Sequence, residues 1–210
     1  MHPWEEISLS DYEQHMSLDS VRQLQTLDSM MKDQLGAYPA DTVMILGVAG
    51  GNGLGHIDTA KYRKVYGVDI NAEYLRAVKD RYPALNGVLE CIRADLTDDT
   101  SVLPTAGLLI ADLLIEYIGF DAFKATVSRV SPGYVSCIIQ VNTDEEGWVS
   151  DSPYLHAFDR LDEVHHQIGE DTLTKAMADI GYRRIYTASE PLPNGKALLR
   201  ADYGRTGGCP

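Results

Sequence analysis

Short runs of apolar residues recur along the chain at intervals that suit the strands of one sheet. Some of these runs, such as 43–46, contain no polar residue, whereas a strand with one exposed face alternates polar and apolar positions. Strands buried on both faces are typical of a parallel sheet, which we therefore predict. The predicted strands lie at 43–46, 65–68, 87–92, 108–112, 134–141, 183–187 and 197–203.

Between the strands, apolar residues recur every three or four positions, which is the spacing of one helix face. Ser17 or Asp19 is expected to cap the first helix and Gly36 to end it, while Asn71 is expected to cap the third. Alternating strands and helices indicate the α/β class. The predicted helices lie at 17–35, 54–60, 72–82, 120–130 and 173–180.

Five glycines follow the first predicted strand within nine positions, at 47, 50, 51, 53 and 55. Glycine loses more backbone entropy on folding than any other residue, so such a cluster indicates positions where a side chain would obstruct. The usual reason is a turn whose backbone N–H groups approach a ligand at the start of a helix. The sequence therefore predicts a nucleotide-type ligand near this turn.

The exits of four predicted strands carry Gly47, Asp69, Asp95 and Asp112. Because ligands of open parallel sheets bind at the carboxyl ends of the strands, these residues are expected to gather around one site. Asp69 is placed to accept hydrogen bonds from both hydroxyls of a ribose. A dinucleotide fingerprint is disfavoured, because His56 stands where its third glycine would fall.

The G-x-G-x-G glycines, the acid after the second strand and the closing hairpin together resemble the class I S-adenosylmethionine (SAM)-dependent methyltransferases. The resemblance covers about residues 40–203. It implies a seven-stranded, mostly parallel sheet with an antiparallel last strand, helices on both faces (a three-layer α/β/α fold) and an amino-terminal helical lid. The expected organisation is a lid at 1–36, a SAM-binding methyltransferase domain at 37–203 and a disordered tail at 204–210.

The resemblance also assigns residues to the cofactor. Asp69 would hold the ribose, Asp95 would accept from the adenine amino group, and Leu96 would pack on the ring. Asp112 and Glu116 would line the transfer site, and Gly47 replaces the acid that usually follows the first strand. The implied SAM-binding residues are Gly47, Ala49, Gly51, Gly53, Asp69, Ile70, Asp95, Leu96 and Asp112.

Other side chains are candidates for the acceptor. In the resembled fold the amino-terminal segment lies across the cofactor mouth, which makes Tyr12, His15 and Met16 lid candidates. Tyr117 is expected beside the transfer site, and Tyr154 lies in the irregular segment 143–163, whose length suggests an insertion over the site.

Methyl transfer to a hydroxyl or ammonium group needs a base, and a neutral histidine suits this task near pH 7. His165 and His166 precede the penultimate helix. In an extended chain they point to opposite faces, so only one of them can serve. Glu116 is the second candidate. The histidines expected at the surface are His2, His56 and His156.

Composition and charge limit the partners. The 210 residues suit a single domain, and a net charge of −13 would repel a nucleic-acid backbone. No spacing of His, Cys or Asp suggests a metal site, and Cys91, Cys137 and Cys209 are expected to be unpaired. Without a signal sequence or a spanning apolar run, a cytoplasmic protein that binds no membrane is expected. A homodimer is also allowed.

The predicted function is transfer of a methyl group from SAM to an O, N or C nucleophile of a small molecule. One alternative is a non-catalytic SAM-binding or partner protein that keeps the fold, which would bind SAM without forming product. Another is a dinucleotide-dependent oxidoreductase, which would bind NAD.

Overall fold

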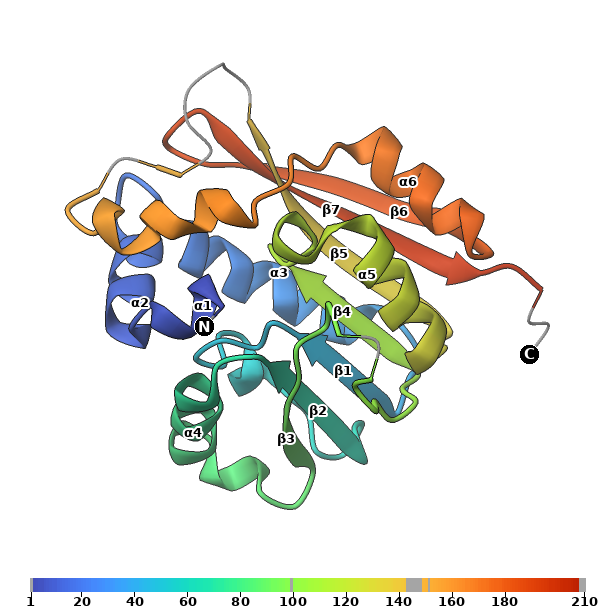
Figure 1. The fold of residues 1–210 in the computed structure, drawn as a ribbon. Helices are drawn as coiled ribbons and strands as arrows, with labels where there is room; N and C mark the ends of the chain where they lie inside the picture. The colour runs from blue at the N-terminus through green and yellow to red at the C-terminus, as the bar shows by residue number, and fades with distance from the viewer. Residues whose placement is uncertain (1, 99, 143–148, 151, 208–210) are drawn as a thin grey trace.

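A seven-stranded sheet forms the centre of the computed structural model, which describes residues 2–98, 100–142, 149–150 and 152–207. The strand order is β3-β2-β1-β4-β5-β7-β6, and β7 alone runs antiparallel to its neighbours (Figure 1). The predicted mostly parallel sheet with an antiparallel last strand is therefore confirmed. The strands are β1 (Thr42–Leu46), β2 (Lys64–Asp69), β3 (Leu89–Arg93), β4 (Leu108–Asp112), β5 (Tyr134–Asn142), β6 (Tyr182–Pro191) and β7 (Lys196–Arg205).

Two hydrophobic cores lie on opposite faces of this sheet. Along β1, Val43 and Ile45 point into one core, while Met44 and Leu46 point into the other. The first core contains residues of α3 (Gln23–Ala37) and α4 (Ala72–Arg81), and the second contains residues of α5 (Ile115–Val130) and α6 (Glu170–Asp179). Since both faces of the inner strands are covered, the continuous apolar runs of the sequence are explained. The three-layer arrangement is confirmed (Figure 1).

The helix predicted at 17–35 is present, but its predicted start at Ser17 was wrong. The chain forms α1 (Pro3–Glu6) and α2 (Leu9–Ser17), and α3 begins only at Gln23. Between α2 and α3 the backbone of Arg22 takes φ 52°, a left-handed conformation that interrupts a right-handed helix. Ser17 therefore ends a helix, whereas Asn71 caps α4 as expected.

The helix predicted at 54–60 is also absent. Leu54–His56 form a single 3-10 turn, η1, after which Ile57 is extended. The carboxylate of Asp58 accepts a hydrogen bond from the N–H of Ala60, which offers the backbone an alternative to a helix. The helical spacing of apolar residues here reflects packing against α3, not a helix.

Two boundaries differ from the expected organisation. Of the segment 1–36, α3 packs on the sheet as part of a layer, and its first residue, Gln23, donates to Gln140 near the end of β5. α1 and α2 lie near the carboxyl ends of the strands (Figure 1). At the other end β7 continues through Arg205, two residues into the expected tail, and 208–210 lie outside the described residues. Residues 143–148 and 151 of the expected insertion also lie outside them, and the rest contains η3 (Leu155–Glu163).

None of the helices in the described part of the chain is long and apolar enough to cross a bilayer.

The glycine turn yields a test of stability. A Cβ added to Gly53, whose φ is +82°, would lie 2.6 Å from Sδ of Met31, whereas a Cβ on Gly55 meets nothing within 4 Å. We expect Gly53→Ala to lower the free energy of unfolding by about 2–4 kcal/mol through overpacking and backbone strain. Urea denaturation measures the change. Gly55→Ala is the matched control, and an equal effect of the two substitutions would contradict this account.

Candidate functional site

The turn after β1 brings the backbone to the carboxyl edge of the sheet. Gly47 takes φ +67°, and its N–H donates to the carbonyl of Val68 at 2.8 Å. Ala49 also takes a positive φ, 45°, and its N–H donates to Oδ2 of Asp69 at 2.9 Å. Gly47 and Ala49 both line a cavity, which we name the first cavity. Two consecutive strand exits are thus tied together at its wall.

Gly51 and Gly53, the later glycines assigned to SAM, do not line this cavity, and their assignment stays a prediction. A Cβ on Gly51 would lie 2.7 Å from the ring of Tyr82, and one on Gly53 would meet Met31. A Cβ on Gly50 would lie 2.3 Å from the carboxylate of Glu13. These glycines are needed because protein side chains pack against them.

Asp69 is buried at the end of β2, with 8% of its surface exposed. Its carboxylate accepts from the N–H of Ala49 and, at 2.9 Å, from the N–H of Asn71. Burial raises the pKa of this carboxyl, and the backbone hydrogen bonds oppose the rise. A carboxylate accepts about four hydrogen bonds, so acceptor positions remain for a ligand. Asp69 and its neighbour Ile70 line the first cavity as expected.

The far side of the first cavity is formed after β3 by Asp95 and Leu96. Oδ1 of Asp95 accepts from the N–H and the hydroxyl of Thr97, at 2.9 and 2.6 Å. Leu96 is buried and offers an apolar surface. The first cavity, including its open mouth, holds about 660 Å³ of space that no atom fills.

Asp112 lines the first cavity at the end of β4. Its Oδ1 accepts from Nε2 of Gln34 at 2.8 Å, and the same Nε2 donates to the hydroxyl of Ser136 at 3.0 Å. Its Oδ2 is buried and has no hydrogen-bond partner among the described residues. Burial raises the pKa of this carboxyl to about 7. A buried acceptor without a partner favours a ligand that donates to it.

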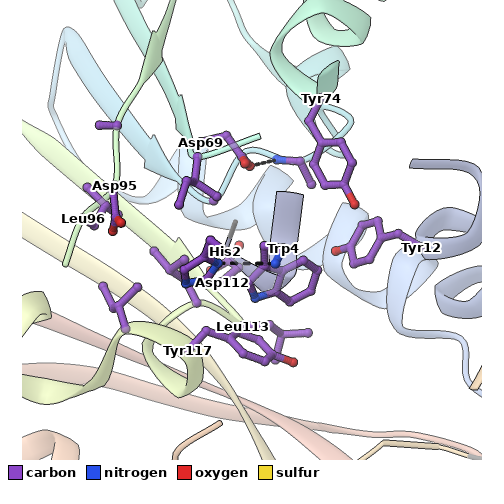
Figure 2. Close-up of a pocket in the computed structure, with 16 residues that line it drawn as sticks. His2, Trp4, Tyr12, Asp69, Tyr74, Asp95, Leu96, Asp112, Leu113 and Tyr117 are labelled. Carbon is purple, nitrogen blue, oxygen red and sulfur yellow. Dashed lines mark hydrogen bonds between the residues drawn. The ribbon is translucent and has the colours of Figure 1, made fainter. Parts of the chain in front are cut away.

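Three aromatic rings lie beside one another in the wall of the first cavity. The ring centroid of Trp4 lies 4.8 Å from that of Tyr117 and 5.9 Å from that of Tyr12, with interplanar angles of 86° and 79°. Figure 2 shows Trp4 between these two tyrosines and His2 next to it. The carbonyl of Trp4 accepts from Nδ2 of Asn71 at 3.0 Å, which anchors α1 to the exit of β2.

Sequence reasoning missed part of this wall. His2 was expected at the surface but lines the first cavity, and Trp4 was not assigned a role. Leu113 also lines it, with an unusual φ of 51° directly after β4. A tryptophan within an otherwise polar amino-terminal segment is the signal that would have suggested Trp4.

A second cavity adjoins the first and shares four wall residues with it: Trp4, Tyr12, Leu113 and Tyr117. Glu116 lines only the second cavity and is 5% exposed. Its Oε1 accepts from the N–H of Gln140 at 2.9 Å, while its Oε2 has no partner among the described residues. Burial raises the pKa of Glu116 to about 7. A carboxyl with this pKa exchanges protons readily near neutral pH.

The adjacent histidines separate as expected. His165 lines the second cavity, and its ring centroid lies 5.9 Å from that of Tyr117. Burial lowers the pKa of His165, so the ring is neutral at pH 7. His166 lies in an outer groove, where its ring would be 3.4 Å from a Cβ on Gly119. The geometry therefore removes His166 from the inner cavities.

The expected lid residues reach the second cavity with one exception. Tyr12, His15 and Met16 line it, and Nδ1 of His15 lies 2.7 Å from the hydroxyl of Ser152. Tyr154, the candidate from the insertion, lines neither cavity, and its hydroxyl donates to Gln14. Across the described residues, no group of three or more His, Cys, Asp or Glu side chains is arranged to hold a metal ion.

The raised pKa of Asp112 makes stability depend on pH. A carboxyl whose pKa rises from 3.8 in the unfolded chain to about 7 in the folded protein stabilises the fold below its unfolded pKa. This stabilisation disappears as the pH rises through the folded pKa. Asparagine does not titrate and keeps the oxygen that accepts from Gln34. We expect the loss of unfolding free energy between pH 5 and 8 to be about 2–3 kcal/mol smaller in Asp112→Asn than in the wild type. Urea denaturation at each pH measures it.

Asp121→Asn is the matched control for this test, because the Asp121 side chain is fully exposed in the same part of the chain. The control should keep the wild-type pH dependence. If the pH dependence of Asp112→Asn equals that of the wild type, Asp112 does not titrate as described.

Comparison with known proteins gives a match in structure alone. No family model matches the chain, and no curated protein matches its sequence. Geranyl diphosphate C-methyltransferase from Streptomyces coelicolor A3(2) superposes with a TM-score of 0.67 at 14% identity, covering 88% of this chain and 81% of that one. Magnesium protoporphyrin IX methyltransferase from Synechocystis PCC 6803, solved with bound SAM, gives 0.61 at 15% identity, covering 87% and 79%.

A third similar structure carries a different activity in its name. The [4+2]-cyclase SpnF superposes with a TM-score of 0.67 at 9% identity, covering 90% of this chain and 84% of that one. At such low identities the likeness concerns the fold. The chain has the Rossmann-like fold of the class I SAM-dependent methyltransferases.

Proposed function

We propose that the chain is an enzyme that transfers a methyl group from SAM to a small molecule. The observation that carries this proposal is the pair of adjoining cavities at the carboxyl edge of the sheet, which share four wall residues. SAM would occupy the first cavity and the acceptor the second. Trp4, Tyr12, Leu113 and Tyr117 would surround the point where the two meet.

The residues of the first cavity fit SAM group by group. The free acceptor positions of Asp69 suit the ribose hydroxyls, and Asp95 with Leu96 suits the amino group and the face of adenine. The partnerless Oδ2 of Asp112 suits the ammonium group of the methionine part. The carboxylate of Asp112 would thereby take over the role of the acid that the family usually has at the position of Gly47.

When bound, SAM supplies a methyl group on a positively charged sulfur, which a nucleophile displaces in line. The protein's task is then to align the acceptor and exclude water. The shared aromatic residues would surround the junction of the cavities, and Glu116 or His165, which both line the second cavity, would take a proton from the acceptor. Glu116 is favoured because its free oxygen is buried there.

A second candidate is a protein of this fold that binds SAM without transferring its methyl group. A neighbour of equal structural similarity is named a cyclase, so the fold alone does not determine the reaction. Binding of SAM without release of S-adenosylhomocysteine (SAH), across a panel of amines, alcohols and acids, would support this candidate.

Cofactor binding is tested by calorimetric titration of the full chain with SAH. We expect saturable binding to the wild type and a loss of about 1.5–3 kcal/mol in Asp69→Asn, because a charged acceptor of the ribose hydroxyls is removed. Asp80→Asn, at an exposed position of α4, should bind as the wild type does. Circular dichroism checks that Asp69→Asn is folded. No heat with the wild type at millimolar SAH would remove the proposed function.

The proton acceptor is tested by the pH dependence of turnover with an acceptor from the same panel. If Glu116 is the base, kcat/KM should rise with pH through about 7, as its carboxyl loses its proton. Glu116→Gln should lower kcat/KM by about 10²–10⁴-fold and remove this rise. If His165 is the base instead, kcat/KM should still rise with pH in Glu116→Gln, and His165→Asn should abolish the rise. The rise would then occur below the ordinary pKa of histidine, because burial lowers the pKa of His165.

A further inference from the structure

The second cavity combines apolar walls with a buried carboxyl group. Met16, Phe158 and Leu161 are all at least 94% buried and contribute to the walls. Oε2 of Glu116 is buried there without a partner among the described residues. Leaving a buried carboxylate oxygen unsatisfied is costly, so a ligand that donates a hydrogen bond and carries positive charge would stabilise it.

The aromatic rings at the junction of the cavities add a second, independent feature. Trp4 is nearly perpendicular to both Tyr12 and Tyr117, so rings in different planes line the junction of the two cavities (Figure 2). Aromatic faces attract cations, and several rings in different planes form the cages that recognise substituted ammonium groups. The junction therefore suits a positive charge.

The charged residues that line both cavities also favour a positively charged ligand. Among the described residues that line them there is no lysine or arginine, whereas Asp69, Asp95, Asp112 and Glu116 are carboxylic acids. Lys196 lines neither cavity, but its Nζ lies 3.3 Å from the hydroxyl of Ser150 in the wall of the second, and it has further interactions of its own. A negatively charged acceptor would find no cation in these walls.

We infer that the acceptor is a small amine on an apolar body, whose nitrogen lies between Glu116 and the rings of Trp4, Tyr12 and Tyr117. This inference rests on the proposed function and names its substrate class.

The balance of charge in the reaction gives the reason. The protonated amine first passes a proton to the carboxylate of Glu116. Its nitrogen lone pair then forms the N–C bond to the methyl carbon as the C–S bond breaks, and the sulfur keeps that electron pair. The positive charge thereby passes from sulfur to nitrogen. A cation is present at the junction before and after transfer, whereas an alcohol would leave a neutral ether and a carboxylate a neutral ester. Walls that stabilise a cation in both states match an amine.

The test compares three probes with one apolar body and different head groups: 2-phenylethylamine, 2-phenylethanol and 3-phenylpropanoate. Each is titrated calorimetrically into the full chain saturated with SAH. We expect the amine to bind at least about tenfold more tightly than the alcohol, and the carboxylate most weakly. Glu116→Gln should remove the advantage of the amine over the alcohol. Glu73→Gln, at an exposed position of α4, should keep it.

The outcomes separate the inference from the proposed function. Failure of SAH to bind would overturn both. If SAH binds but the amine binds no more tightly than the alcohol or the carboxylate, or does not bind at millimolar concentration, the amine inference is overturned and the methyltransferase proposal stands. An amine preference that survives in Glu116→Gln would also overturn it, because recognition would then not depend on Glu116.

Discussion

The carboxylate of Asp69 is the contact on which the site depends. One of its oxygens accepts from Ala49 in the turn after β1, and the other accepts from Asn71 at the start of α4. Asn71 in turn caps α4 and donates to the carbonyl of Trp4. A single buried carboxylate therefore joins two strand exits, one helix start and the amino-terminal segment. Such an acceptor is strong because it is charged and its partners are fixed by the backbone.

Burial of further acids near this contact has an energetic cost. Asp112 and Glu116 each carry one oxygen with a partner and one without, and burial raises the pKa of both to about 7. The hydrogen bonds that Gln34 makes to Asp112 and Ser136 continue through Ser136 to Asp202, which pairs with the buried Arg200. This network holds Asp112 in place beneath the first cavity. Strain and unsatisfied groups of this kind are expected where a structure is organised for a ligand rather than for stability.

Much of the fold was predictable from the sequence because its signals are local. Uninterrupted apolar runs identified inner strands such as β1 and β4, and the ends of β4 were predicted to the residue because Asp112 follows four apolar residues, which are all buried. The acids at the strand exits were expected to gather at one edge, and Asp69, Asp95 and Asp112 do line the same cavity. The prediction of a helix at 54–60 failed because the spacing of Leu54 and Ile57 also suits packing against another helix.

The sequence by itself determined the layered α/β class, the strand exits and the acids that they carry, because burial on both faces and the abrupt end of an apolar run leave a local pattern. Tertiary structure decided which glycines face a cavity and which face Tyr82 or Met31, since the glycine pattern is the same in both cases. It also decided that Trp4 meets Tyr12 and Tyr117, and that Glu116 is buried without a second partner. These features depend on how segments far apart in the chain pack together, and no local spacing records that packing.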